Sequence, residues 1–249
     1  ARCKNLLDLG VNQKELKKAN QILQKKINAS MQAVIERERE TLLRLARAGE
    51  YRDEETGEHI YRIAKYSRLI AEKIGLHQVQ CDVLEQASPM HDVGKIGIPD
   101  YILLKRDQLS EDEFSIMKTH TIIGFEILKD SPSEYLQVGA NIALEHHEHY
   151  NGQGYPKGKR GDEITIEARI VAIADVFDAL TSVRPYKKAW SLDDAFAFIN
   201  NQKGRQFDPE CVEAFLEHAD QVKEIYDTHF EDRPNHFINP NFELFEESK

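Results

Sequence analysis

The chain has few cysteines and no long apolar run. Cys3, Cys81 and Cys211 are odd in number, scattered and without CxxC spacing, which argues against a disulfide framework and a thiolate metal site. Apolar stretches such as ARIVAIADVFDAL are interrupted by charge well short of the roughly 20 residues that span a bilayer, and the N-terminus lacks a signal-peptide core. We therefore expect a cytoplasmic protein without membrane contact, in which histidines and carboxylates bind any metal ion.

Basic residues are fewer than acidic ones, 33 Lys and Arg against 43 Asp and Glu. The formal net charge is −10 over 249 residues, which repels the phosphate backbone of DNA and RNA. Nucleic acid is therefore excluded as a partner, whereas a small phosphorylated ligand in a local basic pocket stays open. A hydrophobic content of 41% is enough for one large domain plus an extension.

The first 48 residues differ from the rest of the chain. Between Asn5 and Leu45 there is no proline, and Gly10 is the one glycine. Apolar residues recur with heptad spacing, as in a parallel coiled coil, at Leu6, Leu9, Leu16, Leu23, Ile27 and Val34. Packing of this helix on its own domain is the alternative, but Asn20 on the seam favours a homodimer, because a buried asparagine pair fixes the register. We expect residues 1–48 to be a helical linker and dimerisation segment.

Residues 49–230 have the period of successive amphipathic helices and no convincing strand, which predicts an all-α domain followed by an irregular tail at 231–249. The motif SEDE at 110–113 is a capping box, and we expect it to open one helix running through Phe114, Met117, Ile122 and Leu128. The motif SLDD at 191–194 is an acidic version of the same signal.

Histidines and acidic residues recur along this domain. A lone histidine such as His120 is more often a satisfied polar residue than a ligand. Asp175, in contrast, is costly inside an apolar helix unless it is paired, hydrogen-bonded or metal-bound. The adjacent pairs His91–Asp92 and His146–His147 point about 100° apart on a helix, so both members serve one site only if that site is broad. A cluster of two or more metal ions is broad enough.

Four motifs in succession resemble the signatures of the HD-GYP family, a subgroup of the HD metal-dependent phosphohydrolases. They are HDVGKIGIPD, KTHTIIGFEIL, HHEHYNGQGYPKGKRGDEI and ARIVAIADVFDALTSVRPYKKAW. The resemblance covers roughly residues 50–220 and implies an HD-type helical bundle that hydrolyses cyclic di-GMP to linear pGpG or GMP; some members act on cyclic GMP-AMP. The opening segment is similar to the linker that follows a receiver domain in response regulators, so we expect such a domain upstream in the full-length protein.

The resemblance also implies residue roles. The implied metal ligands are His59, His91, Asp92, His120, His146, His147 and Asp175, with Glu55 at a third metal position. The carboxylates around Glu55 have a second interpretation, since helix N-termini favour acidic residues anyway. Lys95 and Asp92 match catalytic positions, and Tyr155, Arg184 and Lys187 match substrate contacts. The resemblance implies two or three divalent metal ions. Because the ligands include no thiolate, iron or manganese is favoured, with zinc, nickel and cobalt as alternatives.

Two other functions are consistent with parts of this pattern. A catalytically silent cyclic-dinucleotide receptor is expected to lose ligands, yet every matched position is retained. A general HD-type nucleotidase is expected to lack the RPYKKAW segment at 184–190 and the loop around the triplet GYP at 154–156, called the GYP loop below.

Overall fold

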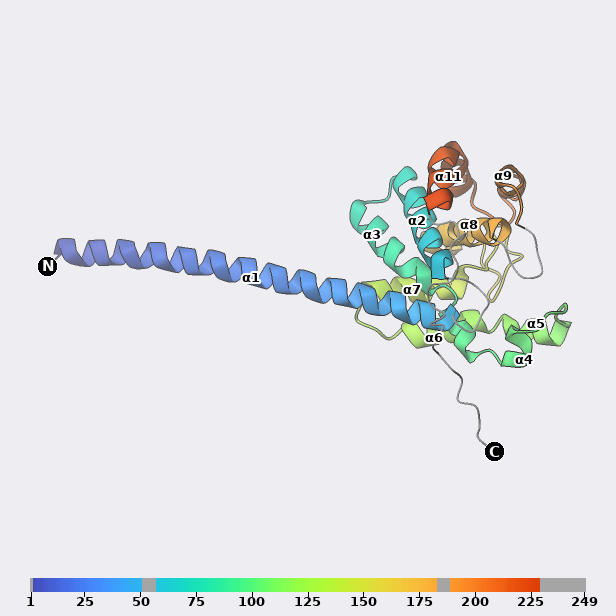
Figure 1. Ribbon diagram of the computed structural model, residues 1–249, viewed down its shortest axis with the longest axis horizontal. Helices are drawn as coiled ribbons and strands as arrows, with labels where there is room; N and C mark the ends of the chain where they lie inside the picture. The colour runs from blue at the N-terminus through green and yellow to red at the C-terminus, as the bar shows by residue number, and fades with distance from the viewer. Residues whose placement is uncertain (1, 51–56, 183–188, 229–249) are drawn as a thin grey trace, which may run out of the picture. The chain divides into compact units, whose positions relative to one another are not determined.

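The computed structural model describes residues 2–50, 57–182 and 189–228 (Figure 1). The chain divides into two compact units, Ala1–Arg44 and Leu45–Lys249. Within the described residues every regular element is a helix, and β-pairing is limited to two isolated bridges. The expected all-α fold is therefore confirmed. None of the described helices combines the length and the apolar character needed to cross a membrane.

The first unit is part of a single long helix, α1, which runs from Arg2 to Glu50. This confirms the expected N-terminal helix. Four apolar residues of the heptad pattern are 44–63% exposed, namely Leu16, Leu23, Ile27 and Val34. The side chains of Leu6 and Leu9 lie outside the part of the chain that the structure describes.

The second unit is a bundle of short helices. Its elements are α2 (Gly57–Lys73), α3 (Gln78–Ala87), η1 (Ser88–Met90), η2 (Val93–Gly97), α4 (Asp100–Leu103), α5 (Glu111–Met117), α6 (His120–Leu128), α7 (Glu134–Glu145), η3 (Gly161–Glu163), α8 (Ile166–Thr181), α9 (Leu192–Asn201), α10 (Pro209–Glu217) and α11 (Ala219–Thr228). Helix α2 packs against α3, α8, α10 and α11, while α7 packs against α3, α6 and α8. Tyr66, Phe177 and Phe215 meet edge to face in the core with ring centroids 5.0–6.2 Å apart.

Both helix starts expected from capping motifs are confirmed. Ser110 and Glu113 form a reciprocal capping box at the start of α5, and the Ser191 hydroxyl accepts a hydrogen bond from the Asp194 amide at the start of α9.

The expectation of one helix through Leu128 was wrong. Helix α5 ends at Met117 and α6 begins at His120, so His120 lies at a helix start rather than inside a helix. The Thr119 hydroxyl donates to the Ile116 carbonyl, and the His120 ring nitrogen Nδ1 donates to the Met117 carbonyl. These side-chain hydrogen bonds compete with the helical ones and turn His120 into the domain interior.

The break allows α6 to lie directly on η2. A Cβ atom added at Gly94 would stand 1.9 Å from the His120 carbonyl oxygen and 2.5 Å from the Gly124 nitrogen. Only glycine permits this approach of two backbones. The contact holds the segment that carries Asp92 against the helix that carries His120.

We therefore expect Gly94→Ala to lower the free energy of unfolding by at least about 1–3 kcal/mol, because the obstructing atoms are backbone atoms that cannot rotate away. Urea denaturation followed by circular dichroism measures the change. Gly97→Ala is the control, since its nearest obstruction is the Ile123 side chain at 2.8 Å. Equal losses in the two variants would contradict this role for Gly94.

Candidate metal centre

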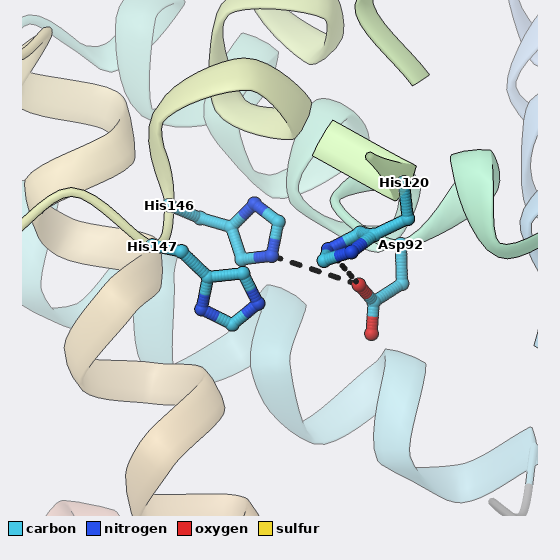
Figure 2. A group of neighbouring side chains, drawn as sticks. All are labelled: Asp92, His120, His146 and His147. Carbon is cyan, nitrogen blue, oxygen red and sulfur yellow. Dashed lines mark ion pairs between the residues drawn. The ribbon is translucent and has the colours of Figure 1, made fainter. Parts of the chain in front are cut away.

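Seven of the eight predicted metal ligands come together in two groups. Asp92, His120, His146 and His147 form the first group, in which one ligand atom from each lies within 4.8 Å of all the others (Figure 2). The second group meets the same criterion and consists of His59, His91 and Asp175. Glu55, the eighth predicted ligand, lies outside the described residues.

The two groups are brought together by the ends of several helices. Asp92 lies between η1 and η2, and His120 begins α6. His146 is the C-cap residue of α7. His59 is on α2 and Asp175 on α8. Asp175 is only half-buried, whereas Asp178 of the same apolar run is fully buried.

Asp92 belongs to the first group and also contacts the second. Its Oδ1 atom lies 3.2 Å from His120 Nε2 and 3.6 Å from His146 Nε2, and its Oδ2 atom lies 3.3 Å from His91 Nε2. Two ligands bound at right angles, each about 2.1 Å from one ion, are about 3 Å apart. The carboxylate therefore offers one oxygen to each group, as a bridging ligand of a two-metal centre does.

The histidine tautomers follow from backbone hydrogen bonds. Nδ1 of His91 lies 3.0 Å from the Ser88 carbonyl oxygen, Nδ1 of His120 lies 2.8 Å from that of Met117, and Nδ1 of His146 lies 3.0 Å from that of Ile142. A carbonyl only accepts, so each Nδ1 carries the hydrogen and, in the neutral ring, Nε2 keeps its lone pair.

These three Nε2 atoms and Asp92 Oδ1 are buried, and among the described residues none of them has a hydrogen-bond partner. Buried polar atoms without a partner are costly, and metal ions would satisfy lone pairs arranged in this way. The residues present therefore fit divalent ions.

Ionisation of the site follows from its burial and charges. Burial opposes the charged form of Asp92, but Lys95 and His91 outweigh it and hold its pKa well below the usual range. Burial likewise opposes a charge on His91, yet the Asp92 carboxylate raises the pKa of His91 to about 9. Burial and the neighbouring histidines lower the pKa of His147. The site thus keeps Asp92 ionised and His147 neutral, the protonation states that metal ligation requires, whereas His91 must lose its proton when an ion binds.

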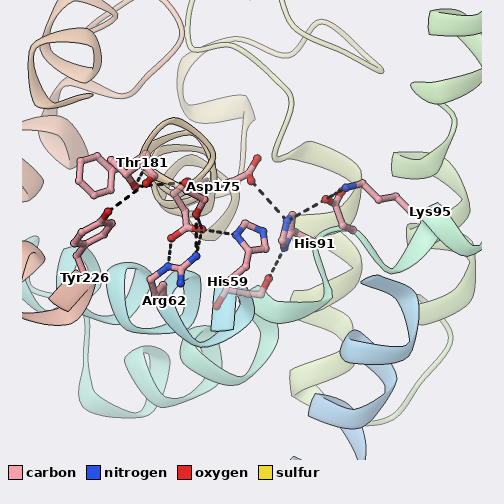
Figure 3. A network of polar contacts seen from close by, with 12 residues as sticks. His59, Arg62, His91, Lys95, Asp175, Thr181 and Tyr226 are labelled. Atoms are coloured by element: carbon pink, nitrogen blue, oxygen red, sulfur yellow. Dashed lines mark hydrogen bonds and ion pairs between the residues drawn. The ribbon is translucent and has the colours of Figure 1, made fainter. Parts of the chain in front are cut away.

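Lys95 contacts the same carboxylate. Its Nζ atom lies 2.8 Å from Asp92 Oδ2, and its side chain is 13% exposed. Figure 3 shows Lys95 near His91, opposite the α8 side of the network. The predicted catalytic lysine is therefore next to the shared ligand.

Sequence reasoning missed the residues that orient His59. His59 Nδ1 lies 2.6 Å from Asp178 Oδ2, and Arg62 donates to both oxygens of the same carboxylate at 2.5 and 2.9 Å (Figure 3). Burial would raise the pKa of Asp178, but His59 and Arg62 together lower it. A carboxylate behind a ligating histidine fixes the ring orientation. The available signal was Arg62, one helical turn after His59.

Two buried carboxylates hold the GYP loop, and they were also missed. Glu148 accepts from the backbone amides of Lys157 at 2.7 Å and Lys159 at 3.0 Å. Glu145 accepts from the Lys159 ammonium at 2.5 Å and from the Thr165 amide at 2.8 Å. Each glutamate is 3% exposed. The basic residue Lys159 is therefore paired with Glu145 and helps to hold the loop in place.

The loop brings Tyr155 to the first ligand group. The Tyr155 and His147 rings are 4.8 Å apart between centroids, and the Tyr155 amide donates to the His147 carbonyl. A Cβ atom added at Gly154 would stand 2.2 Å from the His149 nitrogen, so the chain must be glycine there. Arg184 and Lys187, the other predicted substrate contacts, lie outside the described residues.

Glu148→Gln should raise KM for the substrate about tenfold or more while the metal content stays unchanged, because the amide group turns one donor toward a backbone N–H and loosens the loop. Steady-state kinetics and elemental analysis measure both quantities. Glu163→Gln is the control, since Glu163 accepts from the Arg160 amide in the same loop but is exposed. An unaltered KM would show that the carboxylate is dispensable for the loop.

The chain is similar to several known proteins. A family profile described as HD domain matches residues 21–211. The cyclic di-GMP phosphodiesterase response regulator RpfG of Xanthomonas campestris pv. campestris is 51% identical over 225 residues, which cover 90% of this chain and 60% of that protein. The 3'3'-cGAMP-specific phosphodiesterase 2 of Vibrio cholerae is 45% identical over 186 residues, 75% of this chain and 36% of that protein. The chain thus spans less than two thirds of either relative.

A solved structure has the same fold. The crystal structure of a cyclic GMP-AMP specific phosphodiesterase of V. cholerae, V-cGAP3, aligns with a TM-score of 0.56 at 20% identity, covering 76% of this chain and 53% of that one.

Proposed function

The chain belongs to the HD domain family, and we propose that it is a metal-dependent phosphodiesterase that hydrolyses cyclic di-GMP to linear pGpG or GMP. The observation that carries this proposal is the position of Asp92. Its Oδ1 atom faces the first ligand group and its Oδ2 atom faces the second. The motif resemblance to HD-GYP enzymes and the name of the relative RpfG support the choice of substrate.

The two groups of donor atoms support a place for each of two ions. His120, His146 and His147 would hold one ion and His59, His91 and Asp175 the other, with Asp92 shared between them. Imidazole and carboxylate ligands without thiolate suit iron or manganese. Divalent ions bound there supply Lewis-acid activation of the phosphodiester and lower the pKa of water. Glu55, four residues before His59, would ligate a third ion.

The residues of the chain perform the remaining tasks. Lys95, held 2.8 Å from Asp92 Oδ2, places an ammonium where it can neutralise or protonate a departing alkoxide. Tyr155 lies beside His147 and offers its ring face or hydroxyl to the dinucleotide. Arg184 and Lys187 would contact the phosphates, for which a guanidinium fork is well suited.

Two observations weigh against the alternative functions. A silent receptor has no need of buried Nε2 atoms directed at a common carboxylate, and a general nucleotidase has no need of a loop held by two buried glutamates. Substrates with adenine, such as cyclic GMP-AMP, remain the second candidate because of the Vibrio relative.

The wild-type chain, reconstituted anaerobically with Fe(II) or Mn(II), should convert cyclic di-GMP to pGpG or GMP. Lys95→Ala should retain metal and substrate binding but lose about 100-fold or more in kcat, because its charge acts mainly in the transition state. Chromatography of the products and elemental analysis measure both effects. Lys73→Ala, at an exposed position, is the control.

Binding of cyclic di-GMP without turnover in the wild type would favour the receptor, and turnover of deoxynucleoside triphosphates alone would favour the nucleotidase. An unchanged kcat in Lys95→Ala would remove that residue from the mechanism.

We also propose that α1 forms a homodimer and links the enzyme to an upstream receiver domain. The exposed heptad residues Leu16, Leu23, Ile27 and Val34 support the dimer, and the similarity to RpfG, a response regulator, supports the receiver domain.

Light scattering should therefore give a dimer for the full chain and a monomer for a chain beginning at Glu50, because removal of α1 takes the apolar seam with it. Substitution of the exposed seam residues Leu16 and Leu23 by glutamate in the full chain is expected to have the same effect. Equal masses for the full and shortened chains would contradict pairing through α1.

A further inference from the structure

A row of rings leads from the first ligand group to the surface of the domain. The His147 ring lies 4.8 Å from that of Tyr155, and the Tyr155 ring lies 6.2 Å from that of Phe114, measured between centroids. Phe114 is 46% exposed. A large aromatic side chain therefore lies open to solvent one ring beyond the predicted substrate contact Tyr155.

An ammonium group lies over the outer end of this row. Lys118 Nζ is 5.1 Å from the centroid of Phe114 and 5.8 Å from that of Tyr155. Lys118 follows Phe114 by four residues, and its amide donates to the Phe114 carbonyl, so both side chains share one helical face. The position of the charge is thus set by the last turn of α5.

Lys118 differs from the other cations around the site. Lys95 contacts Asp92, Lys105 contacts Glu113 and Lys159 contacts Glu145. Within the described ranges, no carboxylate pairs with Lys118, although it is half-buried and the chain carries a net charge of −10. Its three N–H donors therefore remain available to an acceptor on a ligand.

We propose that Phe114 and Lys118 form a guanine contact of the substrate site, with the base packed on the exposed ring and the ammonium donating to O6 and N7. This inference rests on the proposed function and extends it to base preference. Aromatic side chains are general stacking surfaces for nucleobases. Guanine presents two adjacent acceptors, O6 and N7, on the edge that lysine recognises.

The same chemistry selects against adenine and distinguishes a base from a phosphate. Adenine has an amino donor in place of O6, and an ammonium has no acceptor to offer it. A phosphate would gain from the charge of Lys118 but nothing from an exposed ring. The pairing of ring and ammonium therefore favours cyclic di-GMP over a dinucleotide with adenine at this position.

Lys118→Met tests the contact, because methionine keeps an apolar stem over the rings and removes the charge. KM for cyclic di-GMP should rise about tenfold or more, while hydrolysis of bis(p-nitrophenyl) phosphate, a diester without a base, should not change. Cyclic di-AMP should be affected less than cyclic di-GMP. Lys129→Met is the matched control, since Lys129 Nζ lies 5.8 Å from the Phe125 centroid on α6.

Phe114→Ala provides a second variant, which should fold because Phe114 is exposed, and it should also raise KM for cyclic di-GMP about tenfold. Unchanged kinetics with cyclic di-GMP in both variants would overturn the proposal. An equal loss with the base-free diester in Lys118→Met would also overturn it, by showing a phosphate contact.

Failure of the proposed function gives a different result. The wild type would then hydrolyse none of the cyclic dinucleotides. Calorimetry with cyclic di-GMP would still decide the guanine contact, because weaker binding to Lys118→Met than to the wild type supports it and equal binding overturns it.

Discussion

The buried Asp92 carboxylate, which stays ionised only beside positive charge, is the constraint on which this domain depends. The Nε2 atoms of His91, His120 and His146 and the Lys95 ammonium all lie within 2.8–3.6 Å of its oxygens. Lys95 compensates for the burial of this carboxylate, and divalent ions held between Asp92 and the Nε2 lone pairs would add to that compensation. The break between α5 and α6, the glycine contact of η2 with α6 and the end of α7 all serve to bring these groups to Asp92.

The end of α7 joins the first ligand group to the GYP loop. The four consecutive residues 145–148 have two roles: the inner pair, His146 and His147, belongs to the ligand group, while the outer pair, Glu145 and Glu148, holds the GYP loop. The loop returns Tyr155 to the His147 ring. Because adjacent side chains are directed by one short segment of backbone, displacement of the loop and displacement of the ligands are coupled.

The sequence predicted the candidate ligands better than it predicted the residues that orient them. Six of the seven candidate ligands within the described residues stood out because each lies in one of the four quoted motifs, and the all-α class followed from helical periodicity. Periodicity did not reveal the break at Thr119, since the apolar pattern continues across it while a tertiary contact with Gly94 requires the turn. Asp178 and Arg62 are 116 residues apart, and no local sequence pattern predicts that two such distant residues form an ion pair. Glu148 stood next to the ligands but resembled any acidic loop residue.

We expect two ions to share Asp92, and anomalous diffraction at the absorption edge of the bound metal tests this arrangement. Two peaks should appear about 3.5–4 Å apart, one beside His120, His146 and His147 and the other beside His59, His91 and Asp175, with Asp92 between them. A third peak next to the His59 group would add the predicted Glu55 site. A single peak, or peaks that do not share Asp92, would contradict a two-metal centre built on this carboxylate.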